Sequence, residues 1–292
     1  MKKIFTFVLI FFLSTNTFSE QLSNQDVDIS FGSTLSNSSL PVSQLIGGPF
    51  TIDNAGTIES TNGSTIRIDV DTTLNNSGLI DADVTDNGQA IQFFQNSGNN
   101  SLTNSGTIRI ESTGGFSPAI KVQGSTVSSI TNTATGMIQS SGATTVAEGI
   151  RVDSTGSSVN LITNQGNISA TGAVGARGIS VLGGSARINQ INNSGSITAQ
   201  GGTGVTNGIV FFGDGGTSVV NSGSITGTAT DQNANGIRFA RDLTTLNNSG
   251  AILGSQHGVS VGGTLTNIIN TGTITGTAGY GVNNDGSITN LT

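Results

Sequence analysis

Apolar and polar residues alternate in a unit that recurs from about residue 50 to the end of the chain. The unit consists of an aliphatic residue, Asn, Gly and Ile, each separated from the next by one residue. It appears as IDNAGTI (52–58), LNNSGLI (74–80), LTNSGTI (102–108), ITNQGNI (162–168), INNSGSI (191–197), VVNSGSI (219–225), LNNSGAI (246–252) and IINTGTI (268–274). A further copy, ITNTATGMI (130–138), has two extra residues between Asn132 and Gly136. Successive unit glycines lie 22 to 30 residues apart, which indicates a repeat architecture.

Two other short apolar elements lie between these units. One is an apolar pair just before the Asn unit, such as Val127 with Ile130 or Ile188 with Ile191. The other is usually Gly or Ala, an aliphatic residue, a spacer and then Val or Phe. Its copies are AIQF (90–93), AIKV (119–122), GIRV (149–152), GISV (178–181), GIVF (208–211), GIRF (236–239) and GVSV (258–261).

All three elements alternate with the period of a strand rather than that of a helix. Like elements recur one full repeat apart, which disfavours hairpins. Every Ile is buried if the chain coils, so that each strand stacks in parallel on its copy in the next turn, with a rise of about 4.8 Å. The sequence therefore predicts an all-β fold: a right-handed parallel β-helix of about nine coils of 22–30 residues, with three short strands of three to five residues per coil.

The polar residues of the unit have structural roles in such a coil. Asn can adopt left-handed backbone angles at a corner and hydrogen-bond to the neighbouring main chain. Stacked on its copies, the Asn amide can form an internal ladder from donor to acceptor. Gly lets the chain turn tightly without a clash at a Cβ atom. The spacers of variable length, such as 201–207 and 228–235, are predicted loops.

The N-terminus predicts export. Lys2 and Lys3 precede an unbroken apolar run at 4–13, and a polar stretch follows at 14–19. This is the layout of a Sec signal peptide over residues 1–19, with cleavage predicted before Glu20. The run is too short for a membrane anchor, which needs roughly 20 apolar residues. Residues 20–49 lack the repeat and are predicted to form an N-terminal cap segment, and residues 50–292 the β-helix.

Composition narrows the possible functions. Without Lys2 and Lys3, 8 basic residues face 17 acidic ones, a formal charge of −9, which argues against nucleic-acid or anionic-membrane partners. The chain has no Cys, so disulfides, thiolate metal sites and a cysteine nucleophile are excluded. With His257 as its one histidine, a zinc site is improbable.

Tandem NSGxI units alternating with GIxV strands, behind a Sec signal and without Cys, resemble the autotransporter passenger repeats of Gram-negative bacteria. The resemblance covers residues 50–292 and implies a rod displayed at the cell surface or outer membrane, or released, as an adhesin, autoaggregation factor or protease. Such passengers cross the outer membrane through a C-terminal β-barrel. Here the repeat runs to the last residue, so we expect a chain truncated in mid-coil, with membrane association only through a missing barrel and a periplasmic location if none exists.

Two motifs suggest catalysis but have simpler interpretations. His257 precedes Gly258, as in parallel β-helix pectinases, but the pair of aspartates that such enzymes use as acid and base is absent. In the repeat alignment His257 occupies the position of Glu148, Arg177 and Asn235, which indicates a variable loop position. GDGGTS (213–218) resembles a serine-protease motif, but Gly215 stands where the nucleophile should be.

The densest acidic cluster is a candidate Ca²⁺ site, since Ca²⁺ takes six to eight oxygen ligands. No repeated GGxGxD signature accompanies it, which favours a solvated acidic face. The cluster consists of Asp69, Asp71, Asp81, Asp83 and Asp86.

The sequence assigns no catalytic, cofactor-binding or metal-binding residue and no cofactor. We expect a non-enzymatic exported rod for adhesion or autoaggregation, whose partner is an unknown surface ligand, a host cell or a second copy of itself. The alternative is a β-helix hydrolase or lyase acting on polysaccharide.

Overall fold

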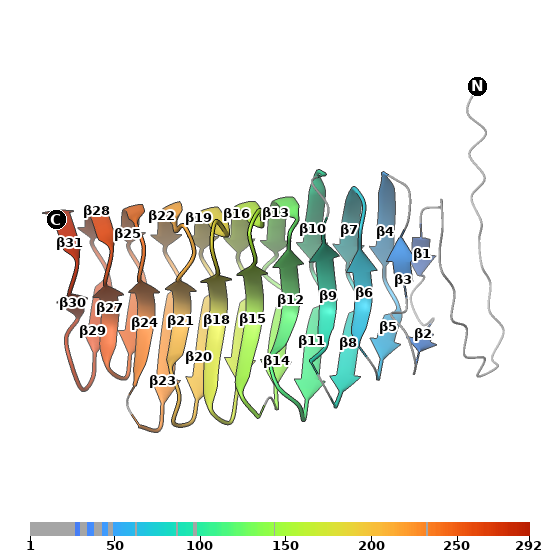
Figure 1. The fold of residues 1–292 in the computed structure, drawn as a ribbon, viewed down its shortest axis with the longest axis horizontal. Helices are drawn as coiled ribbons and strands as arrows, with labels where there is room; N and C mark the ends of the chain where they lie inside the picture. Colours follow the sequence, from blue (N-terminus) through green and yellow to red (C-terminus); the bar gives the residue numbers. More distant parts are fainter. Residues whose placement is uncertain are drawn as a thin grey trace.

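A computed structural model describes residues 27–29, 34–37, 43–45 and 49–292, except 62, 86, 96, 97, 143 and 232. Within these ranges the protein is an all-β parallel solenoid without helices, so no helix there could cross a membrane. The coils stack side by side from β1 at one end of the rod to β31 at the other (Figure 1). The predicted fold class is confirmed.

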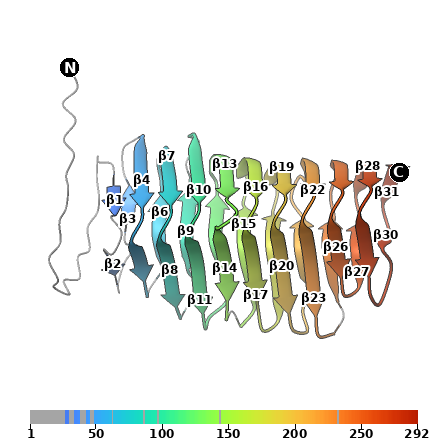
Figure 2. The ribbon, with the colours of Figure 1, turned by 180° about the vertical axis from the view of Figure 1, so that it is seen from behind.

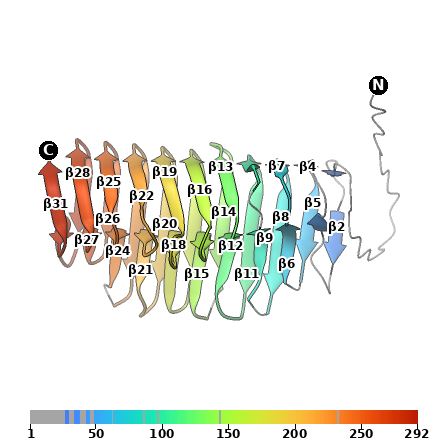
Figure 3. The ribbon, with the colours of Figure 1, turned by 45° about the horizontal axis from the view of Figure 1, so that its top comes forward.

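Three parallel sheets form the walls of the solenoid. Figure 2 shows the rod from behind, and Figure 3 shows it with its top turned toward the viewer. The first sheet consists of β1 (Val27–Ile29), β4 (Phe50–Asn54), β7 (Thr72–Asn76), β10 (Asn100–Asn104), β13 (Thr126–Asn132), β16 (Ser158–Asn164), β19 (Arg187–Asn193), β22 (Gly216–Asn221), β25 (Leu243–Asn248), β28 (Thr264–Asn270) and β31 (Ser287–Leu291). The second consists of β2 (Thr34–Asn37), β5 (Thr57–Ser60), β8 (Leu79–Val84), β11 (Thr107–Ser112), β14 (Met137–Ser141), β17 (Asn167–Thr171), β20 (Ser196–Gly201), β23 (Ser224–Ala229), β26 (Ala251–Gly254) and β29 (Thr273–Gly276). The third consists of β3 (Ser43–Leu45), β6 (Ser64–Ile68), β9 (Gln89–Phe94), β12 (Ser117–Gln123), β15 (Val146–Asp153), β18 (Gly175–Leu182), β21 (Thr206–Phe211), β24 (Ala234–Phe239), β27 (His257–Val261) and β30 (Val282–Asn284).

The sheets contain 11, 10 and 10 strands in the described ranges, more than the nine coils expected. The repeat count missed β1 to β3, whose sequences lack the Asn unit, and β30 and β31, which follow its last copy. The strands are also longer than the expected three to five residues, reaching eight in β15 and β18. They are longer because pairing extends through the polar residues that flank each aliphatic pair.

Columns of apolar side chains from all three sheets fill the interior. Ile66, Ile91 and Ile120 stand in register in the third sheet and are fully buried. Further along the same sheet, the buried rings of Phe211 and Phe239 stack with their centroids 5.5 Å apart. Burying each such side chain contributes roughly 1.5–3 kcal/mol, so the periodic aliphatic positions of the sequence explain the coil.

The Asn of each unit joins an unbroken internal ladder at the end of the first-sheet strands. Each Nδ2 donates to the Oδ1 of the Asn one coil further along, at 2.7–2.8 Å. This confirms the predicted ladder of Asn54, Asn76, Asn104, Asn132, Asn164, Asn193, Asn221, Asn248 and Asn270. The expectation of left-handed backbone angles is wrong, because these residues end β-strands and none has a positive φ.

The glycine of the unit is needed for close stacking and not for a left-handed turn. A Cβ on Gly195 would lie 2.1 Å from the carbonyl oxygen of Gly166 in the preceding coil. None of the unit glycines has a positive φ. Glycine therefore avoids a clash at a Cβ atom, as predicted. The clash it avoids is with the preceding coil and not within a tight turn.

The predicted signal peptide, 1–19, lies outside the described residues, as does much of the predicted cap at 20–49. Within that segment β1, β2 and β3 pair in parallel with β4, β5 and β6. The three sheets thus begin before the first Asn unit.

Candidate functional site on the outer face of the third sheet

Basic side chains recur at one position of the third-sheet strands. The spacer in the repeated Gly-aliphatic-spacer-Val element points outward between two buried residues, as in β15, where Ile150 and Val152 flank Arg151. Parallel register aligns these spacers in a column along the rod. The column contains Arg67, Gln92, Lys121, Arg151, Ser180, Val210, Arg238 and Ser260.

A second column runs beside it, nearer the start of each strand. In it Glu148, Arg177, Asn207, Asn235 and His257 occupy equivalent positions of successive coils. The register confirms that His257 stands at a position whose residue type changes from coil to coil.

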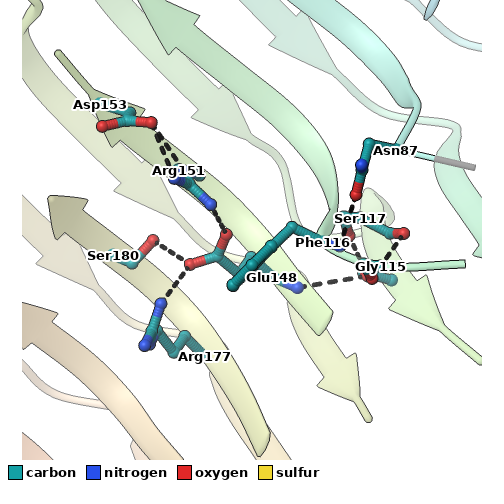
Figure 4. A network of polar contacts seen from close by, with 10 residues as sticks. Asn87, Gly115, Phe116, Ser117, Glu148, Arg151, Asp153, Arg177 and Ser180 are labelled. Carbon is teal, nitrogen blue, oxygen red and sulfur yellow. Dashed lines mark hydrogen bonds and ion pairs between the residues drawn. The ribbon is translucent and has the colours of Figure 1, made fainter. Parts of the chain in front are cut away.

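Glu148 joins two neighbouring coils of this face in one polar network (Figure 4). Its carboxylate is fully buried and accepts hydrogen bonds from Arg151 Nη1 at 3.0 Å, Arg177 Nη1 at 3.0 Å and Ser180 Oγ at 2.8 Å. Arg151 also donates to Asp153 at 2.7 Å. A carboxylate held by two guanidinium groups and a hydroxyl is an anchor for its neighbours.

The charges of this network shift the pKa values of its bases in opposite directions. Burial lowers the pKa of Arg151, but Glu148 and Asp153 outweigh it, so the pKa is raised above its usual range. Burial also lowers the pKa of Lys121, and the neighbouring Arg151 lowers it further, against the attraction of the same acids.

Three arginines of this sheet stack on phenylalanine rings. The guanidinium carbon lies 4.1 Å from the ring centroid for Arg67 over Phe94, and 5.2 Å for Arg238 over Phe212. For Arg151 the distance to the ring of Phe116, which is 44% exposed, is 5.4 Å. Such stacking holds a cation in place while leaving donors free for a ligand.

Four buried side-chain atoms have no hydrogen-bond partner within the described part of the chain, and all four lie at the starts of third-sheet strands. They are Thr145 Oγ1, Arg177 Nε, Asn207 Nδ2 and Asn235 Oδ1. Buried polar atoms are usually satisfied. The strip beside the basic column is therefore unusually rich in unused donors and acceptors.

His257 is the first residue of β27 and pairs with Asn235 of β24, so the predicted loop position is wrong, although the side chain is partly exposed. Its ring stacks on Tyr280 with centroids 5.7 Å apart, and its Nδ1 accepts a hydrogen bond from the Tyr280 backbone N–H at 3.0 Å. Within the described ranges, no pair of carboxylates contacts His257. GDGGTS also has a local explanation, since Gly215 adopts a φ of +84° and a Cβ there would meet the Asp242 carbonyl oxygen.

The predicted acidic cluster is divided between two walls of the rod. Asp69 follows β6 and pairs with Arg67 at 3.0 Å, while Asp81 in β8 pairs with Arg109 at 2.6 Å. Asp86 lies outside the described residues. Among the residues that are described, no three His, Cys, Asp or Glu side chains gather where they could hold a metal ion.

The basic column was missed in the sequence because its members are about one repeat or more apart. The signal that could have revealed it is the spacer of TIRI, AIKV, GIRV and GIRF, which is basic each time. Aligning the repeats and comparing the charge at each aligned position would therefore have located the basic column.

Comparison of the chain with protein-family models, with curated proteins and with solved structures gave no match. The architecture defines a parallel β-solenoid, which is compatible with a β-helix passenger.

Proposed function

We propose that the chain is the rod of an exported, autotransporter-like surface protein that binds through its outer side chains and catalyses no reaction. The supporting observation is that the interior is nearly the same in every coil whereas the surface changes from coil to coil. The interior repeats the same aliphatic columns and Asn ladder coil after coil. The partly exposed spacer column of the third sheet, in contrast, changes from Arg67 to Gln92, Lys121 and Arg151 over successive coils.

The chemistry of the third-sheet face favours binding over catalysis. General acid–base hydrolysis needs a carboxyl group free to exchange its proton with a substrate. Glu148 is fully buried beneath Arg151, Arg177 and Ser180, so its oxygens are occupied by structural partners. Fixed donors and stacked cations are instead typical of recognition surfaces.

Adhesion can be tested with beads coated with the purified chain. We expect the beads to bind to cells, to polysaccharide-coated surfaces or to one another, and beads coated with heat-unfolded protein not to bind. Failure to bind in all three settings would overturn the adhesive role. New reducing ends or unsaturated products released from polysaccharide, and lost in His257→Ala, would favour the polysaccharide-degrading alternative instead.

Export can be tested separately by expressing the chain with its own N-terminus in a Gram-negative host. We expect a processed protein outside the cytoplasm that begins at or near Glu20. An unprocessed chain retained in the cytoplasm would contradict export.

A further inference from the structure

We propose that the outer face of the third sheet binds an acidic polysaccharide whose chain runs along the rod axis. The inference rests on the proposed function of a binding rod and adds its class of ligand. We call this surface the basic strip. It comprises Arg67, Lys121, Arg151, Arg177 and Arg238 with the rings of Phe94, Phe116 and Phe212.

The basic strip concentrates positive charge on an acidic protein. It contains five of the ten Lys and Arg residues of the chain. Three acids, Asp69, Glu148 and Asp153, pair with three of the five bases. No acid in the described ranges forms an ion pair with Lys121 or Arg238. Five bases and three acids leave a net charge of +2, whereas the whole chain carries −7, so this face is the one to which an anion is drawn.

The strip has the dimensions of an extended chain. Its column advances by one coil at a time, with a spacing of about 4.8 Å. Arg67 and Arg238 are separated by six coil steps, which corresponds to roughly 29 Å. A linear polymer of sugar units, each comparable in length to one coil step, can therefore contact several coils at once.

The side chains of the strip match the chemical groups of a uronic-acid polymer. Guanidinium groups bind carboxylates through paired hydrogen bonds. The exposed ring of Phe116 offers an apolar platform for the C–H face of a sugar.

A polyphosphate fits this surface less well. Duplex DNA carries one negative charge per about 1.7 Å of its axis. The two unpaired bases, Lys121 and Arg238, are four coil steps apart, or roughly 19 Å. The 17 acidic residues of the chain would repel so dense an anion. Sparse charge combined with the exposed aromatic ring of Phe116 favours the acidic polysaccharide.

The proposal can be tested by titrating the full chain with polygalacturonate, neutral dextran and single-stranded DNA, using calorimetry at low and at physiological salt. The strip variant is Lys121→Gln/Arg238→Gln. Glutamine is tolerated in this column, since Gln92 occupies it. The matched control is Arg109→Gln/Arg187→Gln, which removes the same charge from the second and first sheets. Circular dichroism and thermal melting verify that both variants are folded.

We expect the strip variant to bind polygalacturonate at least about tenfold more weakly, and the control to stay within about twofold of the unaltered chain. Dextran should not bind. Equal losses in both variants, or equal binding of dextran, would overturn the proposal, and tighter binding of DNA would replace it with a polyphosphate site.

If coated beads adhere but polygalacturonate does not bind, the ligand class fails while the proposed function stands. If polygalacturonate binds but coated beads adhere to nothing, the proposed function fails.

Discussion

Asn132 donates from Nδ2 to the Oδ1 of Asn164 at 2.8 Å, although three residues rather than one separate Asn132 from the glycine of its unit. The two extra residues form an exposed turn at 134–135. Asn132 still donates to the Gly136 carbonyl oxygen at 3.1 Å, as Asn164 does to the Gly166 carbonyl oxygen at 3.3 Å. The ladder therefore fixes the corner of the coil, and the chain between its members adapts.

Replacing Asn164 by Asp should destabilise the protein strongly at neutral pH. Asn164 is fully buried, accepts from Asn132 and donates to Asn193. An ionised carboxylate can still accept but cannot donate, and it would lie close to the Gly166 and Ser196 carbonyl oxygens. We expect the free energy of unfolding to fall by about 3 kcal/mol, as measured by urea denaturation.

Protonation restores a donor, so this deficit should shrink when the measurement is repeated at about pH 4. The control is Asn160→Asp, because Asn160 is exposed and only accepts, from Asn189 Nδ2 at 3.0 Å. Its effect should stay within about 0.5 kcal/mol. An equal loss of stability in both variants would show that the ladder has no special role.

Gly195→Ala should be among the most damaging of the small substitutions. Its Cβ would lie 2.1 Å from the Gly166 carbonyl oxygen and 2.5 Å from the Gln165 carbonyl carbon. Neither atom can yield without separating two coils. We expect a loss of at least about 3 kcal/mol in urea denaturation.

Gly262→Ala is the matched control, since a Cβ there meets its nearest atom, the Phe239 carbonyl oxygen, at 3.5 Å. It should change the free energy of unfolding by less than about 1 kcal/mol. If Gly195→Ala proved as mild as Gly262→Ala, the coils would be able to separate more easily than this geometry implies.

Glu148→Gln should destabilise the rod more than Arg177→Asn does. Removing the carboxylate leaves Arg151 and Arg177 next to each other without a shared anion. Removing Arg177 leaves Glu148 its bonds from Arg151 and Ser180, and Asn occupies the same column in Asn207. The first loss should be about 3 kcal/mol and the second clearly smaller, by thermal or urea denaturation. The reverse order would mean that Glu148 is not the hub of the network.

Interior and surface differed in how far they could be predicted from sequence. The Asn ladder and the aliphatic columns were predictable because each recurs once per coil, so a single coil describes them all. The need for glycine in the unit was predicted correctly, but the contact that requires it was not. A single repeat does not show how closely one coil stacks on the next. The Glu148 network could not be predicted, because Arg151 lies on its own strand and Arg177 on the next. These contacts could be predicted only if the register between the two neighbouring strands were known.

Binding of polygalacturonate should weaken as the pH rises, and it should do so earlier for the unaltered chain than for Lys121→Arg. Burial and the charge of Arg151 lower the pKa of Lys121, against the attraction of Asp153 and Glu148, so Lys121 loses its proton below the ordinary lysine value of about 10.4. A bound polyanion stabilises the protonated form, so binding takes up a proton and deprotonation opposes it. Arginine keeps its charge throughout. Affinities measured from about pH 7 to about pH 10 should therefore diverge between the two proteins. Identical profiles would show that Lys121 does not contact the ligand.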